Sequence, residues 1–140
     1  MSHQRKAVLT TVNARFEHKV SEGRVSFTLP LKTLSEANIS EHWTKRAARH
    51  KQQKAAVHYA MNLLKSHIKM PCTITCKRYG KRLLDAHDNL PISFKHILDQ
   101  ICVCITGDKR PGRADGTPGL SFRYDQEKSK EYFIKITIDF

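Results

Sequence analysis

The carboxyl-terminal stretch EYFIKITIDF constrains the fold most strongly, because isoleucine occupies every second position within it. Ile134, Ile136 and Ile138 would all project to one side of an extended chain, and polar side chains would alternate with them on the other side. The stretch RVSFTLPL shows the same alternation over residues 25–29 and then reaches a proline, which stops a strand. The sequence therefore predicts strands of a sheet that is apolar on one face.

Two longer segments have the periodicity of amphipathic helices. The first helix is predicted from about Glu41 to His67, with Ser40 as its N-cap. Its second half carries an apolar stripe of Val57, Met61, Leu64 and Ile68. The second helix is predicted from about Leu90 to Val103, with a buried stripe of Leu90, Phe94, Ile97, Leu98 and Ile101. The predicted core is thus one apolar face of each helix packed on the sheet.

The order of these elements predicts the fold class. The stretch CTITCKRY between the helices is rich in β-branched residues and predicts a strand, and SFRYD with the last strand predicts a terminal hairpin or strand pair. The order β-α-β-α-β-β in 140 residues indicates one small α/β (α+β) domain, with a mixed sheet flanked by two helices. We assign this domain to residues 25–140. Residues 1–24 form a basic N-terminal extension, in which residues 8–12 are either an extra edge strand or a loose arm.

The charge balance points to a polyanionic partner. The chain has 25 lysines and arginines against 13 acidic residues, a formal net charge of +12. Such an excess is typical of proteins that bind nucleic acid. No apolar run is long enough for a membrane span or a signal peptide, so we expect a cytoplasmic protein. The four cysteines lack the usual zinc spacing and are predicted to be buried free thiols.

The first half of the first helix concentrates this positive charge. Lys45, Arg46 and Arg49 lie there, with Glu41 as the nearby acid, and they predict a surface that contacts DNA phosphates rather than an ordinary solvated face. Trp43 is either a core residue or a platform for a stacked base. The histidines of this helix are predicted to form a polar face, and they are His42, His50, His58 and His67.

The stretch RLLDAHDNLPISFKHILDQ raises a different question, since Asp85 and Asp88 lie close together in so basic a chain. A shared divalent cation is one reason for such a pair, because Mg²⁺ is typically held by one or two carboxylates together with waters and phosphates. The plainer alternative is a helix cap with a surface acid beside it. Either Asp88 or Asn89 would cap the following helix.

Two further segments bring residues that suit phosphodiester chemistry. Lys95 and Asp99 lie on the predicted helix, where they either form an ion pair or leave the lysine to meet a scissile phosphate. The loop of residues 106–119 is rich in glycine and contains Asp115. Its cations Lys109, Arg110 and Arg113 are predicted to hold phosphate, and Asp108 is predicted to pair with its basic neighbours.

Three of these stretches resemble the RusA-type Holliday junction resolvases of phages and prophages. They are TLPL with the later NISEHW, then RLLDAHDNL with Lys95 and Asp99, and finally PGRADGTPGLSFRYDQEK, over about residues 25–138. The family motif is an Arg, an Asp-x-Asp-Asn-Leu run, a Lys on the next helix and a third Asp. Here it matches Arg82, Asp88, Asn89, Lys95 and Asp115. This chain has one extra residue between its first two aspartates, so either Asp85 serves after an insertion or Ala86 leaves the site one ligand short.

The resemblance implies a homodimeric endodeoxyribonuclease in the cytoplasm of a bacterium or a phage-infected host. It would resolve four-way DNA junctions by paired symmetric nicks, with Mg²⁺ or Mn²⁺ as cofactor. The implied metal ligands are Asp85, Asp88 and Asp115, and Lys95 is the implied catalytic cation. Arg82 and Asn89 are predicted to contact DNA. Two other classes of protein remain open. One is a non-catalytic nucleic-acid-binding protein, and the other is a small structural or regulatory phage protein. Neither class places the chain in a membrane.

Overall fold

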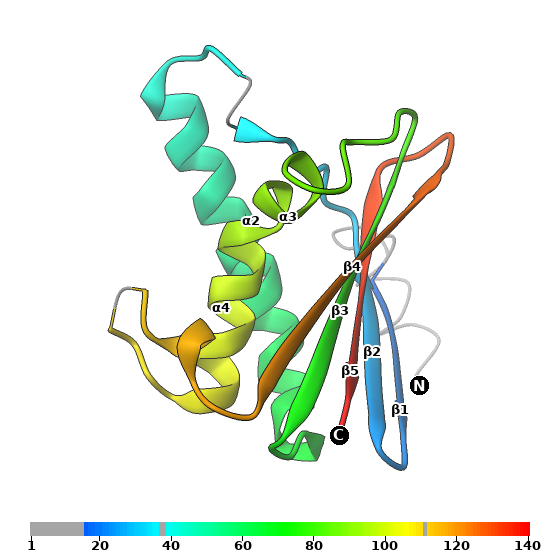
Figure 1. Ribbon diagram of the computed structural model, residues 1–140, viewed down its shortest axis with the longest axis vertical. Coiled ribbons are helices and arrows are strands. Elements are labelled where there is room, and N and C mark those ends of the chain that lie inside the picture. Colours follow the sequence, from blue (N-terminus) through cyan, green and yellow to red (C-terminus); the bar gives the residue numbers. More distant parts are fainter. Residues whose placement is uncertain (1–15, 37–38, 111) are drawn as a thin grey trace, which may run out of the picture.

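A five-stranded mixed sheet forms the base of the molecule in the computed structural model, which describes residues 16–36, 39–110 and 112–140 (Figure 1). The strands lie in the order β1-β2-β5-β3-β4. Their bounds are Glu17–Ser21 for β1, Arg24–Leu29 for β2, Cys72–Gly80 for β3, Leu120–Lys128 for β4 and Phe133–Asp139 for β5. The sheet and the helices that cover it confirm the predicted single α+β domain.

The pairing of the last strands differs from the predicted hairpin. β3 lies between β4 and β5, parallel to β4 and antiparallel to β5. A parallel pair needs a crossover connection, and the segment between β3 and β4 supplies one through its helices. The hairpin prediction was wrong because proximity in sequence does not exclude the insertion of a third strand between two neighbours.

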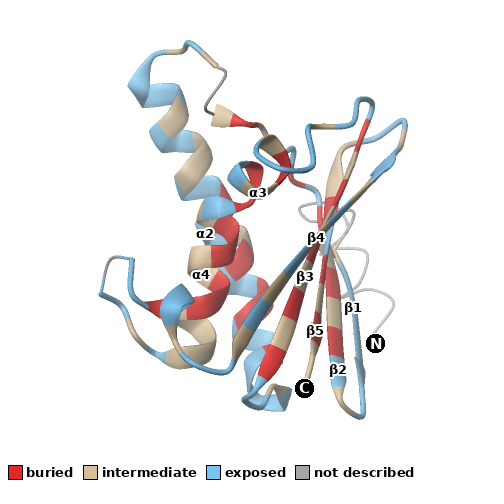
Figure 2. Ribbon diagram, in the orientation of Figure 1, coloured by how far each residue is buried: buried red, intermediate tan, exposed pale blue. Residues whose placement is uncertain are grey.

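The described helices all lie on one face of the sheet (Figure 1). They are α2 at Trp43–Leu64, α3 at Asn89–Ser93 and α4 at Lys95–Thr106. The predicted isoleucine row of β5 is fully buried against them, as are the alternating residues of β2. Figure 2 shows this buried layer between sheet and helices, with the first turns of α2 exposed. Registered rows such as Phe27, Ile136, Cys76 and Tyr124 cross the sheet under the helices.

The second predicted helix is two helices. α3 ends at Ser93, Phe94 adopts a non-helical conformation, and α4 begins at Lys95. The predicted stripe is nevertheless buried on both sides of the break, and Phe94 itself is 0% exposed. α4 continues beyond Val103 and ends at Gly107, which is in the left-handed region with φ of 76°. A break at a buried aromatic residue leaves no periodicity signal, so the sequence pattern could not reveal it.

The start of α2 also differs from the prediction. His42, rather than Ser40, is the N-cap, and its Nδ1 accepts a hydrogen bond of 3.2 Å from the backbone N–H of Thr44. Trp43 is 72% exposed, which contradicts the core alternative for this residue. The helix ends earlier than predicted, and residues Lys65–His67 form a single 3-10 turn. The first turns of α2 project beyond the sheet (Figure 1), and the helix begins with the exposed Trp43.

The sheet extends into the segment predicted as an N-terminal extension. β1 pairs with β2 along its whole length, and β2 begins one residue before the predicted boundary at residue 25. Residues 8–12, which were predicted as an edge strand or an arm, lie outside the described residues. The predicted free cysteines are confirmed, with three of the four buried. Within the described ranges, no helix has the length and apolarity needed to cross a membrane.

A buried arginine ties the loop before α2 to the end of β3. The guanidinium of Arg78 donates hydrogen bonds of 3.4 Å to the carbonyl of Thr33 and 2.7 Å to the carbonyl of Arg82. The residue is 4% exposed, and burial lowers the pKa of its guanidinium. The side chain of Arg78 therefore holds together the segments around Thr33 and Arg82, which do not pair with each other as strands.

Replacing Arg78 by Met is expected to lower the free energy of unfolding by about 2–3 kcal/mol, since two carbonyls lose a charged donor. Urea denaturation of both proteins measures this difference. Arg123→Met is the matched control, because Arg123 lies exposed on the adjacent strand and should change stability little. An Arg78 variant as stable as the control would contradict this role.

Candidate functional site

A cleft of about 600 Å³ lies between α4 and the loop that follows it. Asp99 on α4 and Asp115 on the single 3-10 turn Ala114–Gly116 supply its carboxylates. Lys95, from the first turn of α4, lines the same cleft. The remaining lining residues are mainly cations and small residues, and include Lys54, His96, Lys109, Arg110, Gly112 and Arg113. The cleft thus contains two carboxylates, and several cationic side chains line it together with them.

The two carboxylates influence one another. Burial raises the pKa of Asp99 above its usual value, and the nearby charge of Asp115 raises it further. The charges of Lys95 and Lys54 act in the opposite direction but do not cancel this effect. Burial and the negative charge of Asp115 thus both disfavour the ionised form of Asp99. A divalent ion would relieve the repulsion, and the pair matches the one or two carboxylates that Mg²⁺ takes.

Lys95 and Asp99 do not form the ion pair that was one alternative for them. Among the described residues, the contacts of Asp99 include no salt bridge, and Lys95 affects it only through its charge. The ammonium group of Lys95 remains exposed at the cleft. This arrangement leaves the lysine available to an anionic ligand.

The cationic side chains of the loop after α4 differ in whether they already form an ion pair. Arg110 pairs with Asp108 at 2.8 Å, which confirms the predicted ion pair of this aspartate. The hydrogen bonds from the Arg110 side chain and backbone lower the pKa of Asp108 to about 2. Lys109 and Arg113 are exposed and line the cleft. Of the three predicted phosphate ligands in this loop, Arg110 is therefore the one already paired.

Asp85 and Asp88 lie in a separate turn before α3. The carboxylate of Asp85 accepts hydrogen bonds from the backbone N–H groups of His87 at 3.5 Å and Asp88 at 3.3 Å. Asp88 occupies the N-cap position of α3, but its side chain makes no capping hydrogen bond. Asp85 therefore closes the turn before the helix. Asp88 lies at one of the two predicted capping positions, but its carboxylate is exposed.

Three contacts hold this acidic turn in place. Gln126 on β4 both accepts from the backbone N–H of Leu84 and donates to its carbonyl, each at 2.8 Å. Ser35 donates to the amide oxygen of Asn89 at 2.7 Å. Arg78 holds the carbonyl of Arg82, as described above. The turn is fixed to the sheet and to the loop before α2. Sequence reasoning named Asn89 and Arg82 as DNA contacts and missed these structural roles.

The structure does not bring Asp85, Asp88 and Asp115 together. In Figure 1 the turn before α3 lies at the upper end of the helical layer, and the 3-10 turn lies lower, beside α4. Asp85 and Asp88 do not line the cleft that contains Asp115. Among the described residues, the three carboxylates do not form a set of ligand atoms within 4.8 Å of one another. The partner of Asp115 is Asp99, which sequence reasoning had placed only as a neighbour of Lys95.

The arginines in the first half of α2 lie close to acidic side chains, so they are less available to bind DNA phosphates than predicted. Arg49 makes ion pairs with Glu36, at 2.6 Å, and with Glu41. The hydrogen bond to Glu41 is the main cause that raises the pKa of Arg49. Arg46 lies 3.8 Å from both carboxylates. Sequence reasoning had counted only Glu41 as an acid here, because Glu36 precedes the helix and reaches it only in the folded chain.

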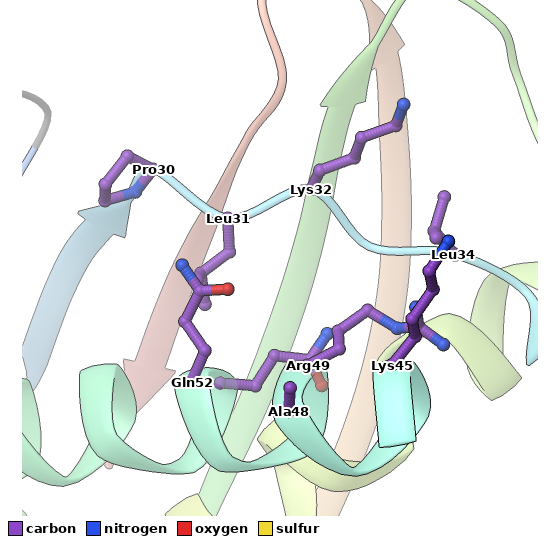
Figure 3. Close-up of a pocket in the computed structure, with 9 residues that line it drawn as sticks. Pro30, Leu31, Lys32, Leu34, Lys45, Ala48, Arg49 and Gln52 are labelled. Carbon is purple, nitrogen blue, oxygen red and sulfur yellow. The ribbon is translucent and has the colours of Figure 1, made fainter. Parts of the chain in front are cut away.

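A second hollow of about 490 Å³ lies beside this cluster, between residues 30–34 and α2 (Figure 3). Arg49 and Lys45 line it, and Lys32 points away from the helix. No acidic residue lines this hollow, and most of its lining is apolar or amide. It therefore lacks the carboxylates of the cleft beside α4, which is the better candidate site.

Comparisons with known proteins add little. No protein-family profile matches the chain, and no curated protein matches it significantly. A solved structure, the cell wall anchor of the T6SS from Pseudomonas aeruginosa, aligns with 96% of this chain and 94% of its own at 9% sequence identity, with a TM-score of 0.41. A likeness this weak supports no statement about function.

Proposed function

We propose that this protein is a Mg²⁺- or Mn²⁺-dependent endodeoxyribonuclease that cuts branched DNA. The observation that carries the proposal is the pairing of Asp99 and Asp115 inside a cationic cleft. A basic surface gives affinity for phosphates, and paired carboxylates suit a divalent cation. The four-way junction is proposed as substrate from the resemblance to RusA-type resolvases. Paired symmetric nicks need two clefts, so the proposal includes a homodimer.

The side chains of the cleft have separate roles in this proposal. Asp99 and Asp115 would hold the metal ion, which when bound activates a water and neutralises charge on the phosphate. Lys95 stabilises the negative charge that develops on the phosphate in the transition state. Lys109 and Arg113 bind the neighbouring phosphates of the same strand. The resemblance implies a catalytic role for Asp88, but Asp88 lies on a separate turn outside this cleft and is therefore tested separately.

In the decisive experiment, a synthetic four-way junction and a linear duplex are each incubated with the protein, with and without Mg²⁺ or Mn²⁺. We expect paired nicks near the branch point that require metal, and little cutting of the duplex. Asp88→Asn tests the acidic turn in the same assay. An intact junction under every metal condition, despite tight binding, would contradict the nuclease proposal.

A non-catalytic nucleic-acid-binding protein is the second candidate. The separation of Asp85 and Asp88 from Asp115 favours it, since the implied set of three ligands does not assemble. Such a protein should bind DNA but leave it uncut under every metal condition, and Asp99→Asn should only tighten this binding, because one repulsive charge is lost. A small structural or regulatory protein would instead show a shallow dependence of DNA binding on salt concentration.

Trp43 is expected to stack on an unpaired base near the branch point. Its ring is 72% exposed and stacks on His42, with ring centroids 5.7 Å apart. Trp43→Ala should weaken binding of a labelled junction by about 1–3 kcal/mol, the usual range for one stacked base. Fluorescence anisotropy measures the affinity, and quenching of this single tryptophan reports the stacking directly.

Leu63→Ala provides the control for Trp43, because Leu63 is 50% exposed on the same helix and lacks an aromatic ring. Its effect on affinity should be small. Unchanged affinity of the Trp43 variant, together with unquenched fluorescence in the wild type, would rule out the stacking role.

A further inference from the structure

A cluster of two histidines and a glutamate lies beside the cleft and has no part in the proposed nuclease reaction. Glu36 comes from the loop before α2, His50 from α2 and His96 from α4. One potential ligand atom from each residue lies within 4.8 Å of the other two. Three segments that are distant in sequence thus place imidazole and carboxylate groups at one point. The predicted polar face of α2 histidines is incorrect for His50, which is half-buried.

The contacts within the cluster are close. His50 Nε2 lies 2.7 Å and 2.9 Å from the two carboxylate oxygens of Glu36. The rings of His50 and His96 stack with centroids 3.5 Å apart and planes inclined by 28°. All three side chains are partly shielded from solvent. The potential ligand atoms of the three residues therefore already lie close together.

Hydrogen bonds hold the carboxylate of Glu36 in place. Its partners are His50 and Arg49. Arg49 donates to Glu36 and is itself fixed by Glu41. Such outer contacts orient a ligating carboxylate in many metal sites. The same arginine also reduces the local negative charge, so we expect moderate rather than very tight affinity.

We propose that Glu36, His50 and His96 bind a divalent transition-metal ion of the Zn²⁺ class. Two imidazoles and one carboxylate are the nitrogen and oxygen ligands that Zn²⁺ takes, with the fourth position left to water. Mg²⁺ prefers oxygen ligands alone, so this site is chemically distinct from the carboxylate pair in the cleft. The ion ties the loop before α2, α2 and α4 together. His96 lines the cleft, and its fixation therefore shapes the cleft wall.

Metal binding is tested on the full chain without an affinity tag, after removal of bound metals with a chelator. Calorimetric titration with Zn²⁺ should show one ion per chain. Co²⁺ should give visible absorption bands of a site with low coordination number and without thiolate ligation. At a hundredfold excess of free Zn²⁺ over Kd, the melting temperature should rise by roughly 5–15 °C.

Single substitutions test whether Zn²⁺ binds at the proposed site. His96→Ala should abolish the Zn²⁺-dependent rise in melting temperature, whereas His58→Ala should retain it, because His58 is exposed on α2 and is hydrogen-bonded to Asn62 outside the cluster. Glu36→Gln keeps a hydrogen-bonding side chain and should weaken Zn²⁺ binding at least tenfold, which provides a second variant if His96→Ala fails to fold. Circular dichroism without metal checks folding of each protein.

Some results would overturn the proposal. They are no stoichiometric binding of Zn²⁺ to the wild type, a strong thiolate-to-cobalt absorption band, or equal Zn²⁺ affinity in the wild type and both site variants. These readouts do not depend on DNA cleavage. Failure of the nuclease assay would therefore leave the metal proposal intact, and the reverse also holds.

Discussion

Replacing Asp115 by Asn is expected to reduce metal-dependent cleavage of a four-way junction by about 10²–10³-fold, the usual cost of losing one electrostatic catalytic group. Asn keeps the size of the side chain but removes the negative charge that acts on Asp99. In the proposed mechanism these two carboxylates hold the metal ion. Binding of the junction should persist or tighten slightly, because one repulsive charge leaves a cationic cleft. The loss should therefore appear in the rate of cutting and not in affinity.

Single-turnover cleavage of a labelled junction, combined with anisotropy in Ca²⁺, separates these two quantities. Asp125→Asn is the matched control, since Asp125 is an exposed aspartate on β4 that does not line the cleft. Asp99→Asn should behave like Asp115→Asn. Full cleavage by the Asp115 variant would exclude the cleft as the catalytic centre and would direct attention to Asp88.

Phe94→Ala is expected to lower the free energy of unfolding by about 3–5 kcal/mol, the range for a buried phenylalanine truncated to alanine. The Phe94 side chain is 0% exposed at the break between α3 and α4, and its ring lies 6.3 Å from that of Tyr124 on β4. Phe94 therefore lies where α3, α4 and the sheet meet. A cavity here would weaken the packing of these elements.

Urea denaturation gives the stability, and the DNA cleavage assay at a temperature where the variant remains folded tests the geometry of the site. Ile92→Ala is the control, because Ile92 is 39% exposed on α3 and should cost much less. A Phe94 variant with wild-type stability would mean that the helix break is not held by this ring.

The strands were the most predictable part of the fold. Alternation in β2 and β5 identified the buried faces correctly, because a residue period of two fixes which side chains share a face. The buried stripe of α3 and α4 was also predicted, although the break at Phe94 was not. Short-range periodicity reports burial and is insensitive to a local change in helix direction.

The candidate site was predicted only in part. Lys95 and Asp115 were named from the sequence, and both line the cleft. The pairing of Asp115 with Asp99 and the clamp of Gln126 on the acidic turn were not predicted. Each depends on a contact between segments whose separation in sequence carries no spacing rule.

The sequence by itself determined the strongly basic character, the one-sided sheet and the apolar helix faces, because composition and periodicity are local properties. The tertiary structure decided which charged groups meet. Glu36 reaches Arg49 and His50, and His96 stacks on His50, only because the loop before α2 and the helix α4 pack against the same stretch of α2. Electrostatic partners are set by distances in space, and a linear sequence does not contain those distances.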